Sequence, residues 1–134
     1  MTNGGGRAYR SVPSDVLPRM EHLIRERYEQ IDLYEEQALA AARADSAYDA
    51  AKETIKMRKR LLDGVKTNAE AETWAKVDPE VVELDTQRGV TAGLAKATLL
   101  RIDNLDTEIR MLHSLLVKER DTDRLSSQGY GGGA

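Results

Sequence analysis

The 134-residue sequence contains no cysteine, no phenylalanine, one tryptophan and three prolines. The lack of cysteine excludes disulfide bonds and thiolate metal ligands, so redox chemistry says nothing about the compartment. Aromatic residues form only 4% of the chain, which leaves little bulk for a globular core. No apolar run approaches the roughly 20 residues that a membrane span needs. These shortages favour long helices outside the membrane over a compact globule.

The residues that are abundant are helix formers: alanine, leucine, glutamate, arginine and lysine. Charged residues make up 32% of the chain, yet the net charge is only −3, which predicts neither bulk attraction to nucleic acid nor an acidic tail. The first residues, Met1–Gly6, lack the apolar core of a signal peptide. We therefore expect a single-domain, soluble protein in the cytoplasm.

A bend divides the helical pattern into two long arms. Gly64 suits the left-handed position after a helix end, and Asp78-Pro79 reads as a new helix start, with Asp78 as N-cap. Thr67-Asn68-Ala69-Glu70 resembles a capping box for a short connector.

We predict an all-α fold: two long antiparallel helices that form a coiled-coil hairpin. The helical hairpin spans 14–125, with a long helix over 14–63, a connector helix over 67–77 and a second long helix over 79–124. Residues 1–13 are expected to be a flexible arm, and residues 126–134 a disordered tail.

Apolar residues recur on each arm at helical spacing. The predicted stripe of the first arm is Leu17, Met20, Ile24, Ile31, Tyr34, Ala38, Ala41, Tyr48, Ile55 and Leu62. The predicted stripe of the second arm is Val81, Leu84, Ala95, Ile102, Leu105, Ile109, Leu112 and Leu116. Arg88, Thr91 and Thr98 interrupt the second stripe, which predicts a looser seam there or contact with the connector helix.

Small residues dominate the middle of each arm, over 38–51 and 89–97. If the arms double back, these stretches come together, and we expect a narrow neck where the helices approach closely. Its predicted residues are Ala41, Ala44, Tyr48, Ala51, Gly89, Gly93, Leu94 and Ala97. The alternative is that the two glycines mark a kink. Trp74, on the connector, is either a packing plug against the arms or a binding hot spot.

Several large apolar residues lie off both stripes. They are Leu23, Leu33, Leu39, Leu99, Leu100, Met111 and Leu115. A two-helix hairpin also buries too little surface to be firmly stable by itself. We therefore expect a homo-oligomer or a helical protein partner.

No residue pattern indicates catalysis. The only histidines, His22 and His113, are not expected to converge on a metal ion, and no Glu-x-x-His pair is present. No phosphate-binding loop follows a strand, and no serine has a nucleophile-elbow context. We predict no catalytic residue, no cofactor, no metal, no small-molecule substrate and no membrane contact.

One group of charged residues is clustered in the sequence. Basic residues gather at the connector end of the first arm: Lys52, Lys56, Arg58, Lys59, Arg60 and Lys66. They are either a phosphate-contacting tip for nucleic acid or a cationic last turn that complements the helix dipole. Glu53, Asp63 and Glu70 dilute the patch, and no aromatic residue interleaves it in the sequence.

The layout resembles small helical-hairpin proteins from the early regions of bacteriophages, near recombination and replication genes. The similarity lies in Ala-Tyr-Asp-Ala-Ala-Lys (47–52), Lys-Thr-Asn-Ala-Glu-Ala-Glu (66–72) and Leu-Leu-Val-Lys-Glu-Arg (115–120), and it covers most of Tyr34 to Arg120. The resemblance implies an accessory, non-enzymatic protein of DNA recombination, replication or host takeover, in the host cytoplasm if it is phage-encoded.

Three functions follow from these observations. The first is an accessory protein that acts by protein–protein interaction. The second is direct nucleic-acid binding through the basic hairpin tip. The third is a virion structural, scaffold or assembly-chaperone protein.

Overall fold

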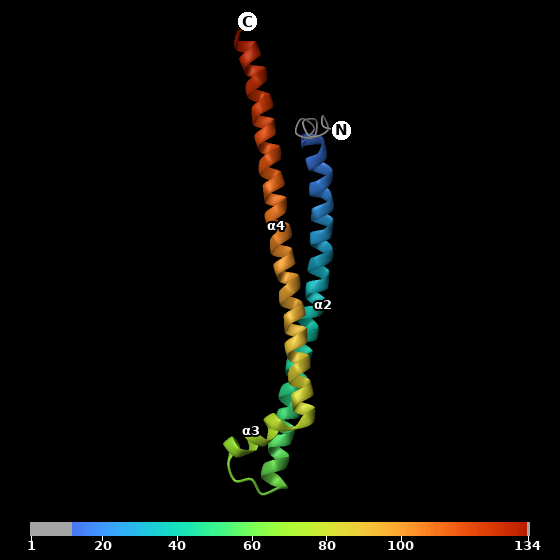
Figure 1. Cartoon of the computed structure of the whole chain (residues 1–134), viewed down its shortest axis with the longest axis vertical. Helices are drawn as coiled ribbons and strands as arrows, with labels where there is room; N and C mark the ends of the chain where they lie inside the picture. The colour runs from blue at the N-terminus through green and yellow to red at the C-terminus, as the bar shows by residue number, and fades with distance from the viewer. Residues whose placement is uncertain (1–11, 134) are drawn as a thin grey trace, which may run out of the picture. The chain divides into compact units, whose positions relative to one another are not determined.

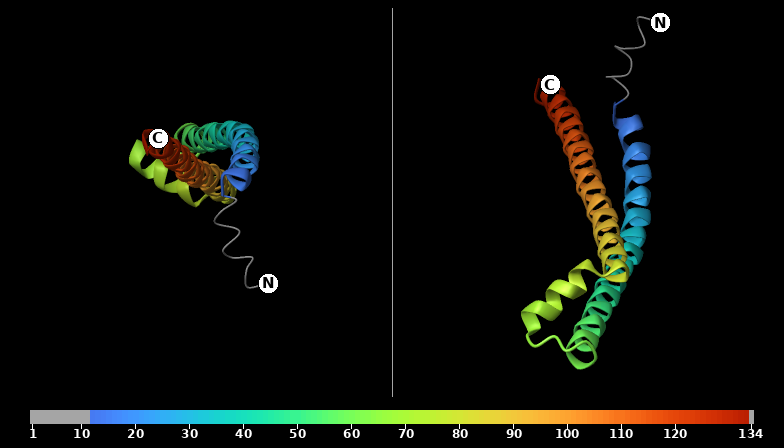
Figure 2. Two further views of the ribbon diagram at one scale, coloured as in Figure 1. Left: turned by 90° about the horizontal axis from the view of Figure 1, so that it is seen from above. Right: turned by 60° about the horizontal axis from the view of Figure 1, so that its bottom comes forward.

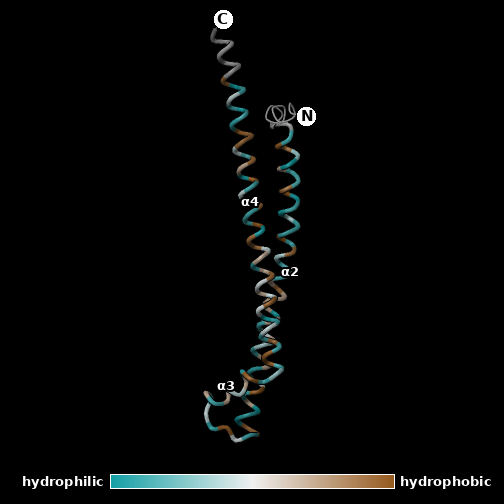
Figure 3. The backbone as a smooth tube through the Cα atoms, in the orientation of Figure 1, coloured by the Kyte–Doolittle hydropathy of each residue, from teal (hydrophilic) through white to brown (hydrophobic). Residues whose placement is uncertain are grey.

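The structure, a computed structural model, describes residues 12–133, and their side chains from Asp15 to Leu125. It consists of α2 (Val12–Leu61), α3 (Asn68–Val77) and α4 (Pro79–Gly133), labelled in Figure 1. No strand occurs between residues 12 and 133, which confirms the all-α class. Figure 3 shows that hydrophobic and hydrophilic residues are interspersed along both long helices.

The helix bounds differ from the expected ones mainly at the C-terminus. α4 continues through Gly133, so the tail expected to be disordered over 126–134 is helical as far as that residue. No proline stops the helix there, and each added residue gains a backbone hydrogen bond. The flexible arm expected over 1–13 lies outside the described residues, except that 12 and 13 already belong to α2.

The end of α2 follows the predicted glycine. Gly64 has a φ of 72°, in the left-handed region that only glycine adopts cheaply. The reversal lets the Val65 N–H donate to the Lys59 carbonyl at 3.1 Å, which satisfies one of the free carbonyls at the helix end.

Both later helices begin at the predicted caps. The Thr67 hydroxyl accepts a hydrogen bond from the Glu70 N–H at 3.2 Å. Asp78 Oδ1 accepts from the N–H groups of Glu80 at 3.0 Å and Val81 at 3.3 Å, with Pro79 as the first residue of α4. Each cap satisfies donors that the first helical turn leaves free.

The chain forms two compact units. The terminal unit comprises residues 12–31 of α2 and 100–133 of α4. The connector unit comprises residues 32–99, which include the rest of both long helices and all of α3.

In the terminal unit, ion pairs show that the two helices run antiparallel. Arg19 pairs with Glu108 at 3.0 Å, and Glu26, seven residues later on α2, pairs with Arg101, seven residues earlier on α4. The seam residues follow a 3–4 spacing, as in a coiled coil. The buried apolar ones are Val16, Leu23, Ile102, Leu105 and Leu116.

In the connector unit, α2 and α4 are also antiparallel. The Thr98 hydroxyl donates to Gln37 Oε1, and the Arg88 guanidinium lies 3.9 Å from the centroid of the Tyr48 ring. α3 lies beside the end of α2, as the right view of Figure 2 and the Lys52–Glu72 ion pair show. One core cluster joins the three helices; it consists of Tyr48, Ile55, Ala75 and Val81, with Ala51 and Leu84 packed against it.

The predicted stripe of α2 is shifted by one residue near its start. Leu17 and Ile24 are 50% and 38% exposed, whereas Val16 and Leu23 are buried. Both sets have helical spacing, so the pattern within α2 does not choose between them. The buried residues of α4 determine which α2 residues are buried, because the two sets must face each other across the seam.

The predicted neck is half right. On α2, Tyr48 is buried and Ala41, Ala44 and Ala51 are half-buried. On α4 the prediction is wrong, because Gly89, Gly93, Leu94 and Ala97 are all exposed. The helix instead turns Arg88, Thr91, Ala95 and Thr98 inward, since a helix face recurs every three or four residues and does not follow a continuous run of small residues.

This orientation predicts the effect of replacing the glycines. A Cβ added at Gly89 or Gly93 would meet nothing within 4 Å. Gly93→Ala is therefore expected to raise the free energy of unfolding by about 1 kcal/mol, because alanine has the higher helix propensity. Chemical denaturation measures this. Gly64→Ala, at the positive φ, is the control and should destabilise; a destabilising Gly93→Ala would contradict the outward orientation.

The Gln37–Thr98 hydrogen bond predicts a second stability pattern. Thr98 is 6% exposed, so Thr98→Val would leave the Gln37 amide oxygen without its donor and cost about 1–3 kcal/mol. The double change Gln37→Leu/Thr98→Val removes both groups and should be close to neutral. Urea unfolding of the three variants tests this, and additive losses would show that the two residues act independently.

Candidate interaction surface at the connector

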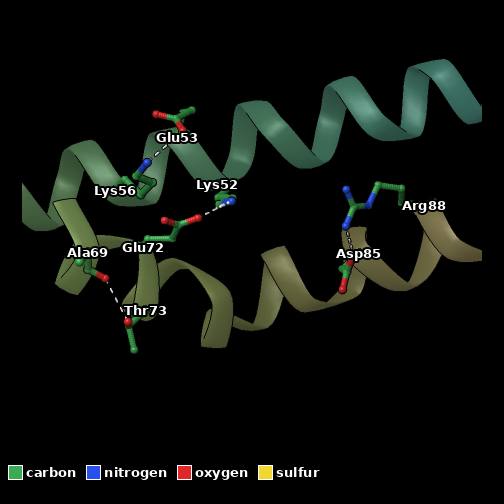
Figure 4. A network of polar contacts seen from close by, with 8 residues as sticks. All are labelled: Lys52, Glu53, Lys56, Ala69, Glu72, Thr73, Asp85 and Arg88. Carbon is green, nitrogen blue, oxygen red and sulfur yellow. Dashed lines mark hydrogen bonds and ion pairs between the residues drawn. The ribbon is translucent and has the colours of Figure 1, made fainter.

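Lys52 joins α2 to α3. Its ammonium lies 2.8 Å from Glu72 Oε1 (Figure 4). The hydrogen bond from Lys52 lowers the pKa of Glu72 below its usual 4.5, and the hydrogen bond to Glu72 raises the pKa of Lys52 above 10.5. Lys52 Nζ also lies 5.9 Å from the centroid of the Tyr48 ring. This predicted nucleic-acid contact therefore serves to dock the connector helix.

Lys59 brings charge and an aromatic ring together. Its Nζ lies 3.1 Å from Asp63 Oδ2 and 4.7 Å from the centroid of the Trp74 ring. Trp74 is 48% exposed, so it is not a buried packing plug. A hollow lies around it, lined by Lys59, Asp63, Gly64, Val65, Lys66, Glu70 and Trp74. The sequence placed no aromatic residue among the basic ones, but the fold does, because α3 returns alongside α2.

The other basic residues divide into two groups. Lys56 pairs with Glu53 at 3.3 Å, one turn away on α2. Arg60 donates to Asn68 Oδ1 and to the Lys66 carbonyl, which are both uncharged acceptors, so its positive charge is not neutralised. Arg58 and Lys66 are exposed. The predicted basic tip thus lies at one end of the connector unit, with three of its six charges, on Lys52, Lys56 and Lys59, in ion pairs.

Apolar side chains are exposed at the same end of this unit. Leu61 and Leu62, at the end of α2, are 75% and 77% exposed. Met57 on α2, and Trp74 and Val77 on α3, are exposed as well. We call these five residues the connector patch. A patch that combines leucine, methionine and tryptophan is typical of a surface that binds another protein.

Arg88 is a seam residue whose role the sequence did not reveal. It pairs with Asp85 at 2.6 Å, one turn away on α4 (Figure 4). Its guanidinium also covers the face of the Tyr48 ring. The hydrogen bond to Asp85 raises the pKa of the guanidinium further. In the sequence, Arg88 interrupts the apolar stripe of the second arm. Its methylene stem and flat cation let it fill a seam position against an aromatic ring.

The two histidines do not converge with other ligands. His22 is 60% exposed, and its Nε2 lies 4.0 Å from Glu26 Oε2, while His113 is exposed on α4. Over the part of the chain that the structure describes, no group of three or more His, Cys, Asp or Glu residues could hold a metal ion. None of the described helices is both long and apolar enough to cross a bilayer.

Comparison of the chain with protein-family models, with curated proteins and with solved structures finds no match.

The Lys52–Glu72 pair predicts a pH dependence. Because the pKa of Glu72 is lower in the folded protein, the pair stabilises the fold above pH 4.5 and loses this effect as the pH falls through the folded pKa. Glu72→Gln should therefore destabilise the protein at pH 7 and have little effect near pH 3. Thermal unfolding from pH 3 to 7 measures the difference. Glu70→Gln, two residues earlier on α3, is the matched control. Equal pH profiles for the wild type and Glu72→Gln would contradict the pairing.

Proposed function

We propose that this chain is a non-enzymatic helical accessory protein that acts by binding other proteins through the connector patch. The observation that carries the proposal is the amount of uncovered apolar surface. Nineteen large apolar side chains between residues 15 and 125 are at least 37% exposed, whereas eleven apolar side chains are buried. A soluble helical protein that exposes so much apolar surface gains stability when a partner covers it.

The proposed scaffold is one antiparallel coiled-coil hairpin formed by α2 and α4. The 3–4 spacing of the seam residues in both units supports this arrangement. α3 would then present the connector patch at the closed end. The helices supply a rigid support, and the exposed leucines and Trp74 supply the contact.

The proposed process is DNA recombination or replication in a bacteriophage-infected cell. It rests on the resemblance in residues 47–52, 66–72 and 115–120. The contacts of Lys52 and Tyr48 in the first of these segments, and of Thr67 and Glu72 in the second, hold the connector helix in place. The resemblance therefore falls partly on residues that position the connector patch.

Affinity purification of the tagged chain from its native cells tests the proposal. Leu61→Ser/Leu62→Ser/Trp74→Ala should lose most of the co-purifying partner, because these side chains are exposed in the free chain and carry the contact. Thr86→Ser/Val90→Ser, exposed positions outside the patch, form the control. Recombination or replication proteins should be enriched with the wild type. Capsid or tail proteins, or no difference between the wild type and the triple variant, would contradict the proposal.

Direct nucleic-acid binding is a second candidate, favoured by one observation. Trp74 is half-exposed beside Lys59, and the nearby Arg60 charge is not neutralised. A base could stack on the free face of an indole while arginine and lysine contact phosphates.

A salt titration of binding to a fluorescent single-stranded oligonucleotide tests this candidate. Lys56→Gln/Arg58→Gln/Lys59→Gln/Arg60→Gln should abolish the binding and flatten its salt dependence. Arg110→Gln/Lys118→Gln, in the terminal unit, is the control. Binding that survives the four changes at the connector would contradict this function.

A further inference from the structure

Besides the hollow around Trp74, a second hollow lies where the end of α2 meets the start of α3. It is lined by Glu53, Lys56, Met57, Arg60, Leu61 and Asn68. We call it the Leu61 hollow. Met57 and Leu61 are four residues apart, so they lie on one face of α2, and they are 59% and 75% exposed. The Leu61 hollow therefore offers an uncovered aliphatic surface within the connector unit.

Arg60 connects the α2 wall of the Leu61 hollow to α3. Its guanidinium donates to Asn68 Oδ1 and, at 3.4 Å, to the Lys66 carbonyl. These contacts hold the arginine between the end of α2 and the start of α3, and neither acceptor carries a charge. The positive charge is therefore fixed at the wall of the hollow and is available to a ligand.

The segment that surrounds the Leu61 hollow is positively charged. Residues 53–70 contain five lysines and arginines and three carboxylates, whereas the whole chain has a net charge of −3. The pairs Lys56–Glu53 and Lys59–Asp63 take two charges of each sign. Among the described side chains of this segment, three cations and one carboxylate are left without an ion-pair partner. This excess of positive charge favours an acidic ligand over a neutral or basic one.

Two of the three unpaired cations lie next to the exposed aliphatic residues. Arg60 lines the Leu61 hollow, and Arg58 is exposed on α2, three residues before Leu61, so the two side chains are neighbours on the helix surface. The third cation, Lys66, and the unpaired carboxylate, Glu70, both line the hollow around Trp74. Aliphatic surface and uncompensated positive charge thus occur together at the Leu61 hollow.

We propose that the Leu61 hollow binds an acidic amphipathic helix of a partner protein. The apolar side chains of this helix pack against Met57 and Leu61, and its carboxylates meet Arg58 and Arg60. Residues 53–61 of α2 give the hollow a length of about 12 Å, which matches apolar anchors on about two turns of the bound helix. This inference rests on the proposed function, and it adds the chemistry of the partner that the connector patch binds.

The aliphatic lining distinguishes this ligand from other classes. Methionine and leucine do not provide the aromatic face on which a base stacks, and Trp74, which does, lines the other hollow. An extended peptide that adds a strand needs a sheet edge, and residues 12–133 contain no strand. A helix with an apolar face and acidic neighbours fits both the lining and the charge of the Leu61 hollow.

Selection from a displayed library of random peptides tests the chemistry of the ligand. The peptides have about 15 residues, enough for four helical turns, and the bait is the full chain. Peptides that also bind Met57→Ser/Leu61→Ser are removed; both positions are exposed, and circular dichroism checks that this variant is folded. The remaining peptides should be acidic, with large apolar residues three or four positions apart. Neutral or basic peptides, or none that distinguish the two chains, would overturn the inference.

Fluorescence anisotropy of a selected peptide tests the charge. Arg58→Gln/Arg60→Gln should weaken binding about fivefold and reduce its salt dependence, because two exposed charge contacts are lost. Arg58→Lys/Arg60→Lys keeps both charges and should bind like the wild type. Arg43→Gln/Lys96→Gln, at exposed positions elsewhere in the connector unit, loses the same charge and is the control. Unchanged affinity of the glutamine variant, or an equal loss in the lysine variant, would overturn the inference.

The remaining outcomes separate this inference from the proposed function. A single-stranded oligonucleotide that displaces the peptide at a lower concentration than unlabelled peptide does would overturn the inference in favour of nucleic acid. A dimer of the chain that Met57→Ser/Leu61→Ser abolishes would assign the hollow to a second copy and overturn it as well. A cellular partner that depends on Leu61, Leu62 and Trp74 but makes its contact through a segment that is not acidic would overturn the inference alone. No effect of those three changes on any co-purifying partner would overturn both.

Discussion

The packing of α2 against α4 is the interaction on which the rest of the structure depends. A helix of about 50 residues with so few large apolar side chains has little to hold it in place except a neighbouring helix. The seam is narrow, and alanine fills many of its positions in the connector unit. In the connector unit, the large buried side chains gather around Tyr48, Ile55 and Val81.

The polar residues within the seam restrict how the helices can pair. Alanine layers are nearly interchangeable, so apolar contact alone would tolerate a shift by one heptad. Gln37–Thr98 and Arg27–Asp106 are contacts that only one alignment forms, and Arg88 covers Tyr48 only in that alignment. Buried polar groups that lose their partners are costly, which makes shifted alignments unfavourable. A similar use of a single polar seam residue sets the register of many coiled coils.

The ends of the helices could be read from the sequence because each end depends on one local residue. Gly64, Thr67 and Asp78 have conformational or hydrogen-bonding properties that act whatever packs around them. The all-α class could also be predicted, because composition and periodicity are properties of the sequence itself. The orientation of α4 could not be read in this way. A run of small residues around Gly93 suggested a close approach, but burial depends on the rotation of the whole helix, which Val81, Ala95 and Ile102 determine together.

The surface at the connector was predicted in part. The basic residues of α2 are adjacent in sequence, so their concentration at one end was visible. Their partners were not, because Glu72 and Trp74 arrive from α3 only after the chain has reversed at Gly64. The same reversal turns several of the cations into structural contacts. It also leaves Leu61 and Leu62 exposed at the end of α2, which no periodic pattern indicates.

The connector patch keeps its position only if α2 and α4 have this alignment in the connector unit. Oxidation of the Ala41→Cys/Ala95→Cys double variant tests this most directly, since these two residues line one groove between α2 and α4 in the connector unit. The described alignment predicts a rapid disulfide within one monomer, whereas Ala41→Cys/Gly93→Cys should not form one. A disulfide in the Gly93 variant and none in the Ala95 variant would contradict the account.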